Sequence, residues 1–266
     1  MKIIKKVIGI GNGAAVYVPK EYSGREITII LPEGIDEIRK RILSQLIEFM
    51  PNIIGAYIYG SYARDEQTNG SDVDLLIIVK EEDGRIKELF KDIDVRVITL
   101  EGLERAVKNM PAIIMPILRE AKVLLNPILL EDFKNRKIDF KKFRWHFEDI
   151  KRVLGIINSF IELDDDEDTS ITNVYSLIMR IRVCYMIESL IKNRIFSNGG
   201  VKKLLLDYGL SEREFEKFYF MYQKVRGDEK FDDKIKKKEI LKLIGIVEKY
   251  SKRVENESKK ASKKGN

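Results

Sequence analysis

Two aspartates interrupt an otherwise apolar β-type segment, and this feature constrains the fold more than any other. The segment reads SDVDLLIIV at residues 71–79, and it follows a second apolar run, NIIGAYIY, at residues 52–59. Residues two apart in a strand project to the same face, so Asp72 and Asp74 share one face of the predicted sheet. Burying charge is costly unless the charge is paired or bound to a metal. The pattern therefore predicts neighbouring strands with a functional carboxylate pair.

A third carboxylate is available on the next predicted strand, DIDVRVITL. Asp94 lies within this run and Asp92 lies at its mouth, and either one comes alongside the first pair if the strands are neighbours. Oxygen ligands without histidine favour Mg²⁺ or Mn²⁺. Three carboxylates can hold two such ions in the arrangement that supports in-line displacement at phosphorus. The sequence therefore predicts a two-ion site for phosphoryl chemistry.

Other common kinds of catalytic site are excluded by composition. His146 is the only histidine and Cys184 the only cysteine. Zinc sites built on cysteine pairs and intramolecular disulfides are impossible, and most Ser-His or Cys-His chemistry is removed. Catalysis in this chain has to depend on carboxylates.

Residues just before the aspartate pair are suited to binding phosphate. Gly60 ends a predicted strand and lets the backbone approach an anion, and Ser61 supplies a hydroxyl and an N–H donor. If residues 61–64 begin a short helix, its free N–H groups favour an anion as well. Arg64 can add a charge-assisted contact, and Ser71 is a further candidate for nucleotide binding.

The chain as a whole reads as an α+β protein with three folded parts. Glycine-punctuated β-type runs fill residues 1–33, which predicts a small N-terminal β module. Strand and helix patterns alternate over residues 34–127, which predicts a central mixed sheet. Residues 128–257 show helical periods and predict an all-α bundle, and residues 258–266 read as a disordered basic tail.

Composition adds only broad limits. The chain has 266 residues, 44% hydrophobic and 35% charged, which is typical of a globular protein. It shows no run of about 20 apolar residues, as a membrane-spanning helix requires, and no signal-peptide pattern. We therefore expect a cytoplasmic protein without a membrane partner.

The Gly-Ser pair, the SDVDL segment and the later DVRV strand together resemble the DNA polymerase β nucleotidyltransferase superfamily, in particular its minimal nucleotidyltransferases with their GSxARG…SDxDL pattern. The resemblance implies that Asp72 and Asp74 are paired metal ligands and that Asp94 is the third ligand and the base. It also implies that Gly60 and Ser61 bind the triphosphate. The chain departs from the pattern at Asp65, where the family has glycine.

The same resemblance implies a reaction. A nucleoside monophosphate passes from a nucleoside triphosphate, with ATP the expected one, to an acceptor hydroxyl, and pyrophosphate is released. Acceptors in related families include proteins, small molecules such as aminoglycosides, and nucleic-acid ends, and the helical part shapes the acceptor site. The motifs do not specify the acceptor.

Residues 10–31, IGNGAAVYVPKEYSGREITIIL, resemble the swapped-hairpin β modules of the AbrB type. Such modules dimerise and some bind DNA, so the resemblance implies a homodimer through residues 1–33 and leaves weak DNA binding open. The alternative function is a DNA-binding regulator or an antitoxin-like protein that uses the nucleotidyltransferase fold. A fused HEPN-type ribonuclease is disfavoured because Arg226 is not followed by a histidine.

Overall fold

The computed structural model describes residues 8–27, 34–67, 71–163, 167–227 and 234–264. The chain divides into two compact units, Met1–Gly34 and Ile35–Asn266. Helices, a central four-stranded mixed sheet and two small antiparallel strand pairs make up the described part, which confirms the predicted α+β class.

The first unit contains a small hairpin. Strands β1 (Ile8–Ile10) and β2 (Gly13–Ala15) pair antiparallel, and the 3-10 helix η1 (Lys20–Tyr22) follows. Gly11 forms the turn with a φ of 54°, in the left-handed region that glycine enters without strain. The remaining predicted strand residues, 1–7 and 28–33, lie outside the described residues. The AbrB-like identity of this unit stays a prediction.

Deletion of residues 1–33 is expected to change the oligomeric state of the protein. The hairpin strands are short, and Ile8 and Ile10 are each 51% exposed. Isolated two-stranded hairpins are at best marginally stable, so this one needs a partner for its apolar side chains. Light scattering should show a different number of subunits for the shortened chain. An Ile8→Ser/Ile10→Ser variant should behave like the deletion, and an unchanged subunit number in both would remove this role.

The second unit is built on one mixed sheet with the strand order β5-β4-β3-β6. Its strands are β3 (Ile53–Tyr59), β4 (Val73–Val79), β5 (Ile93–Thr99) and β6 (Lys122–Leu125). The pairs β3–β4 and β3–β6 run antiparallel, whereas β4 and β5 run parallel. The two central strands are therefore β3, which ends just before the Gly-Ser pair, and β4, which contains Asp74.

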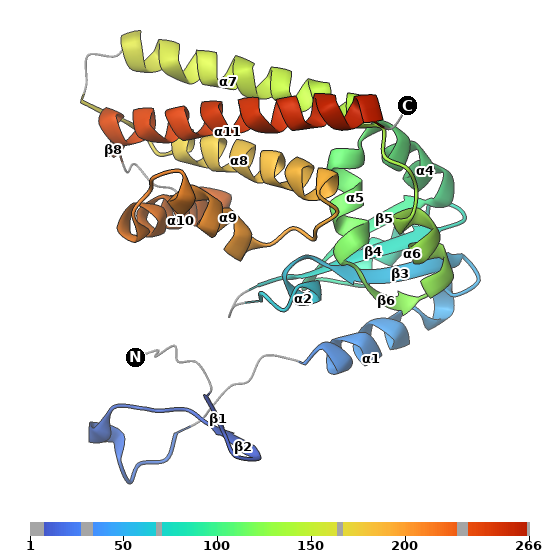
Figure 1. Ribbon diagram of the computed structural model, residues 1–266. Coiled ribbons are helices and arrows are strands. Elements are labelled where there is room, and N and C mark those ends of the chain that lie inside the picture. Colours follow the sequence, from blue (N-terminus) through green and yellow to red (C-terminus); the bar gives the residue numbers. More distant parts are fainter. Residues whose placement is uncertain (1–7, 28–33, 68–70, 164–166, 228–233, 265–266) are drawn as a thin grey trace. The chain divides into compact units, whose positions relative to one another are not determined.

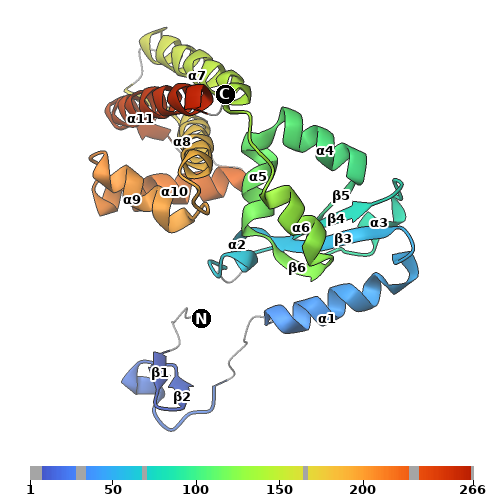
Figure 2. The same ribbon diagram turned by 45° about the vertical axis from the view of Figure 1, so that its right-hand side comes forward.

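Alternation along β4 divides the apolar core between the two sheet faces. Leu75 and Ile77 pack with helix α1 (Ile35–Gln45) on one face. Leu76 and Ile78 pack on the other face, where the sheet is covered by α4 (Leu100–Asn109), α5 (Pro111–Glu120) and α6 (Pro127–Lys134). Figures 1 and 2 show α1 on one side of the sheet and these three helices on the other. The strand thus has one set of side chains for each layer.

Within the described part of the second unit, four short helical elements lie between the longer helices and strands. They are α2 (Gly60–Ala63), α3 (Arg85–Glu88), η2 (Ile47–Phe49) and η3 (Phe140–Phe143). Local sequence sets several boundaries: the Thr99 side chain accepts a hydrogen bond from Gly102 N at the start of α4, and Asn126 caps α6 just before Pro127.

A helical region follows the sheet. It consists of α7 (Arg144–Leu163), α8 (Thr172–Ile191), α9 (Asn198–Asp207), α10 (Glu212–Arg226) and α11 (Lys237–Lys264), with a strand pair of β7 (Asp168–Ser170) and β8 (Lys234–Lys236). A capping box of Ser211 and Glu214 begins α10. None of the helices in the described ranges is both long enough and apolar enough to cross a membrane.

One apolar cluster joins the helical region to the sheet. It runs from Tyr57 in β3 through Met115 in α5 to Val254 in α11, and α5 packs against α8. The boundary predicted near residue 127 therefore does not separate two apolar cores. The helices that follow this boundary share one core with the sheet face that carries the even-numbered residues of β4.

The C-terminal end differs from its prediction. Residues 258–266 were expected to form a disordered tail, but α11 continues to Lys264, and only residues 265–266 lie outside the described part. Ser258 is buried, and its hydroxyl donates to the Phe140 carbonyl oxygen over 3.3 Å. Packing against η3 therefore extends the helix into a segment whose charges alone predict disorder.

Candidate active site

Two aspartates face each other across the parallel strand pair. Asp74 in β4 is in register with Asp94 in β5, and Tyr59 in β3 is in register with Asp74. The three residues form one row across the sheet, on the face that α4 and α5 cover further along the strands. The prediction that a third carboxylate comes alongside the pair depended on β4 and β5 being neighbours, and the sheet order confirms that they are.

Gly60 lies directly against the Asp74 carboxylate. Its φ is 73°, and a Cβ placed on it would lie 1.8 Å from Asp74 Oδ2 and 2.7 Å from Asp74 Cγ. No side chain fits at this distance, so the turn from β3 into α2 requires glycine both for its conformation and for its closeness to Asp74. The short helix predicted after this turn is present as α2.

Burial dominates the electrostatics of Asp74. Its pKa is raised to about 6, first by burial and then by the charge of Asp94. Glu120 raises the pKa further, whereas Arg226 and Arg64 lower it. The half-buried Asp74 carboxylate and the exposed Asp94 carboxylate thus repel each other. A bound cation relieves such repulsion, so this pair is a good partner for one.

The other two predicted carboxylates are not part of the in-register pair, and both are exposed, as Asp94 is. Asp72 is exposed and precedes the first residue of β4, and Asp92 is exposed and accepts a hydrogen bond from Arg41 over 3.0 Å. Within the described ranges, no group of three or more histidine, cysteine or acidic side chains is arranged to hold a metal ion. The structure brings Asp74 and Asp94 together and leaves Asp72 at the edge. Its register favours Asp94 over Asp92 as the partner of Asp74.

Three polar residues predicted to bind nucleotide have distinct settings. Ser61 is half-buried in the first turn of α2, and Ser71 is half-buried just before Asp72. Arg64 donates from Nη1 to Glu120 Oε2 over 2.7 Å and from Nε to Glu66 Oε2 over 2.9 Å. The Arg64 guanidinium is therefore already bound to two carboxylates, and its role in nucleotide binding stays a prediction.

Glu120 was missed by the sequence reasoning. It is the last residue of α5, and its Oε1 accepts the Gly60 N–H over 2.8 Å while its Oε2 accepts from Arg64. Burial raises the Glu120 pKa, and its bonds to Arg64 and Gly60 oppose that shift. In the sequence the only indication is that the largely apolar helix segment PAIIMPILRE ends in two charged residues, Arg119 and Glu120.

The structure shows how aspartate is tolerated at position 65, where the family pattern has glycine. Its φ is 56°, in the left-handed region where glycine is the usual residue. Aspartate tolerates this region better than most residues, and the Asp65 carboxylate accepts a hydrogen bond from Lys122 Nζ over 2.7 Å. The backbone at this position therefore keeps the conformation for which glycine is favoured, despite the different residue.

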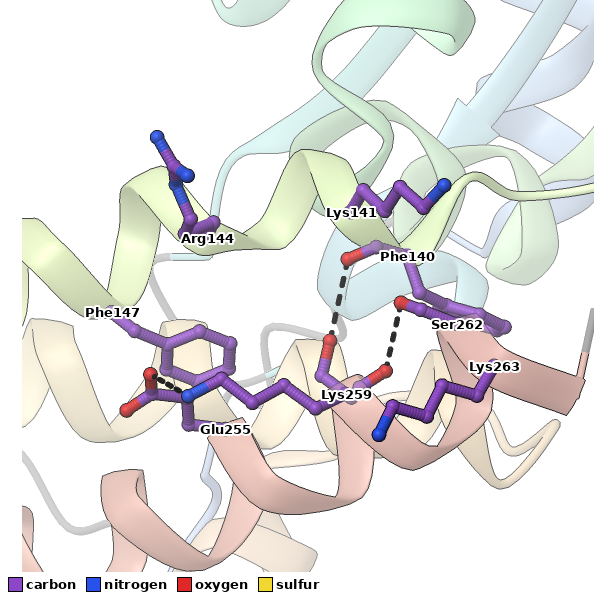
Figure 3. A pocket seen from close by; sticks show the side chains of 9 residues that line it. Phe140, Lys141, Arg144, Phe147, Glu255, Lys259, Ser262 and Lys263 are labelled. Carbon is purple, nitrogen blue, oxygen red and sulfur yellow. Dashed lines mark hydrogen bonds and ion pairs between the residues drawn. The ribbon is translucent and has the colours of Figure 1, made fainter.

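The helical region reaches this site at α10. Arg226, the last residue of that helix, is exposed, and its charge lowers the pKa of Asp74. A separate cavity of about 480 Å³ lies between η3, α7 and α11, where Phe140, Phe147 and Ser262 are among the lining residues (Figure 3). None of the predicted site residues lines that cavity, so it is not part of the aspartate site.

Comparison with known proteins finds one family model that matches the part of the chain containing this site. Residues 35–162 match the family model described as nucleotidyltransferase domain. We call residues 35–162 the matched segment. It contains the whole sheet, the Gly-Ser turn and all the candidate aspartates. No curated protein matches the chain.

Several solved structures are similar to the chain at low identity. The spectinomycin adenyltransferase AAD(9) from Enterococcus faecialis, with ATP and spectinomycin, is 14% identical, with 84% of this chain and 100% of that chain covered and a TM-score of 0.47. A toxin–antitoxin structure with AMP-PNP is 20% identical, with 46% and 97% covered and a TM-score of 0.29. A nucleotidyltransferase-like protein from Exiguobacterium sibiricum is 14% identical, with 84% and 78% covered and a TM-score of 0.32. Likenesses with TM-scores this low do not by themselves indicate a shared activity.

Proposed function

We propose that this protein is a metal-dependent nucleotidyltransferase, which transfers a nucleoside monophosphate from a nucleoside triphosphate, most simply ATP, to an acceptor hydroxyl. The observation that carries the proposal is the register of Asp74 with Asp94, next to a Gly-Ser turn in which Gly60 lies too close to Asp74 for a side chain. The match of residues 35–162 to the family model described as nucleotidyltransferase domain supports the same reaction class.

The donor set of the site suits Mg²⁺ or Mn²⁺. Asp74 and Asp94 offer only oxygen atoms, and burial together with the charge of Asp94 raises the pKa of Asp74 despite the opposing charges of Arg226 and Arg64. We assign Asp74 and Asp94 as ligands and Asp72 as the third, which has to turn inward from its exposed position. Two bound ions would stabilise charge on the α-phosphate and on the leaving pyrophosphate.

The side chains of this protein have separate tasks in the reaction. Asp94 accepts the proton of the acceptor hydroxyl, whose oxygen attacks the α-phosphorus. The bond from that phosphorus to the oxygen bridging to the β-phosphate breaks, and pyrophosphate leaves. Ser61 supplies its hydroxyl and N–H to the triphosphate, with Ser71 and Arg64 as further candidates. The Gly60 N–H is already bonded to Glu120, so Gly60 contributes by letting the backbone come close.

The helical region is assigned to the acceptor side. The charge of Arg226, at the end of α10, lowers the pKa of Asp74, which supports this assignment. The acceptor is a protein, a small molecule or a nucleic-acid end. Dimerisation through residues 1–33 and weak DNA binding by them are separate predictions.

Substitution of Asp72 or Asp74 by asparagine is expected to abolish metal-dependent nucleotide binding. Each change removes a ligand charge, and calorimetric titration with ATP and Mg²⁺ or Mn²⁺ should lose its binding heat. Asp92→Asn is the matched control, because the Asp92 carboxylate forms an ion pair with Arg41 and Asp92 is not in register with Asp74. If both Asp72 and Asp74 variants bind metal and ATP as the parent does, the site lies elsewhere.

Thermal unfolding without metal separates this loss from misfolding. The folded-state pKa of Asp74 is about 6, above its ordinary value of 3.8, so the folded protein holds this proton more tightly and its stability rises as pH falls from above 6 towards 4. Asp74→Asn removes the repelled charge. Its Tm should therefore equal or exceed the parent Tm above pH 6, and the difference should shrink as pH falls.

A further inference from the structure

A buried carboxylate holds the Gly-Ser turn in place. The Glu120 side chain is 5% exposed and its partner Arg64 is 11% exposed. Removing such a pair from water is costly, and an apolar pair of similar volume often gives equal or better stability. An ion pair at this position therefore calls for a reason beyond packing.

The bonds of Glu120 give that reason. One oxygen accepts from the Gly60 amide, the residue that lies against Asp74, and the other accepts from Arg64 at the end of the same turn. Both ends of α2 are thus fixed to a single carboxylate, which itself sits at the end of the rigid helix α5. A small shift of Glu120 would move the turn relative to Asp74.

Arg64 is fixed from the helical region as well. Glu66 accepts from Arg64 and also from the backbone N–H and the side-chain amide of Asn198, over 3.0 and 3.1 Å. Arg182 of α8 donates to Asn198 Oδ1 over 2.7 Å. The guanidinium groups of Arg64 and Arg182 both lie over the Phe196 ring, at 5.3 and 5.0 Å from its centroid. A chain of contacts therefore runs from Glu120 in α5 to Arg182 in α8, with the neutral Asn198 between Glu66 and Arg182.

We propose that Glu120 is a positioning residue for nucleotidyl transfer: it holds the Gly60–Ser61 turn at the distance from Asp74 that the triphosphate requires, with Glu66 and Asn198 anchoring the same turn to α8 and α9. This inference rests on the proposed function. It goes beyond it by assigning an effect on nucleotide binding to a residue that touches neither metal nor substrate. Misplacement of a reacting group by about 1 Å can reduce the reaction rate by about 100-fold. A gain in rate from a fixed turn can therefore outweigh the loss of stability that burying the Glu120 charge causes.

The test compares two buried carboxylates of similar surroundings. Glu188 in α8 is also buried, and it accepts from Tyr250, Arg253 and Lys192 within the helical region, with no contact to the turn. Glu120→Gln and Glu188→Gln should both lower the Tm, because each replaces a carboxylate that accepts several hydrogen bonds. Only Glu120→Gln should weaken the affinity for ATP with Mg²⁺, by about tenfold or more, at a temperature where both variants are folded. Glu66→Gln should act in the same direction with a smaller effect, since Arg64 keeps its bond to Glu120.

Hydrogen exchange gives a second readout that needs no activity. The peptide covering residues 57–66 should exchange faster in Glu120→Gln than in the parent and should be unchanged in Glu188→Gln. Equal effects of the two variants on affinity and exchange, or no effect of Glu120→Gln on either, would overturn the inference. If the parent itself binds no ATP with metal, the proposed function fails, and the exchange comparison alone then decides whether Glu120 holds the turn.

Discussion

Asp94→Asn is expected to reduce the transfer of label from α-labelled ATP to its acceptor by about 100-fold or more, the range expected when a general base is removed. Asp94 is the in-register partner of Asp74, so the change removes both a proton acceptor and a ligand charge. The assay incubates the protein with α-labelled ATP, other nucleoside triphosphates, a cell extract and Mg²⁺ or Mn²⁺. The class of labelled product identifies the acceptor.

Asp92→Asn is the control for this experiment. Asp92 lies only two residues away and is exposed, but its carboxylate pairs with Arg41. Its removal should leave labelling within a few-fold of the parent, about the size of effect expected for an exposed ion pair. Undiminished labelling by Asp94→Asn would transfer the role of base to Asp92 or dismiss the three-carboxylate arrangement. A complete absence of labelling by the parent would favour a nucleotide-binding regulator.

The positions of Asp74 and Asp94 within their strands could be predicted because they depend on local pattern. Apolar runs of strand length marked β3, β4 and β5, and the two-residue period fixed which side chains share a face. What remained open was whether β4 and β5 are neighbours, and the parallel register settled that point in favour of Asp94. Features that depend on alternation within a strand were therefore accessible from sequence.

The contacts of Arg64 could not be predicted in this way. Its partner Glu120 is far away in sequence, and only the packing of α5 on the sheet brings the two together. A basic residue after a Gly-Ser pair reads equally well as a phosphate ligand or as half of an ion pair. Tertiary packing decided between these contacts in the structure, just as packing on η3 made residues 258–264 helical.

Gly60→Ala is expected to cost about 2–5 kcal/mol in the free energy of unfolding, from roughly 1–2 for the left-handed backbone and about 1–3 for overpacking. The added Cβ would lie 1.8 Å from Asp74 Oδ2, and Asp74 is too short to swing away without leaving its place beside Asp94. Binding of ATP with metal should therefore be lost together with stability. Urea unfolding and calorimetry measure the two effects.

A double-mutant cycle separates the two causes of this loss. Asp74→Ala removes the carboxylate that the new Cβ meets and leaves only the Cβ of residue 74, at 3.2 Å, so in that background Gly60→Ala should cost little more than the backbone contribution of about 1–2 kcal/mol. Gly155→Ala in α7 is the control for glycine replacement, because nothing lies within 4 Å of its Cβ position, and it should stabilise by about 0.5–1 kcal/mol. Equal costs of Gly60→Ala in both backgrounds would show that only the backbone conformation requires glycine. A neutral effect in both would contradict the closeness of the turn to Asp74, on which the proposed nucleotide site depends.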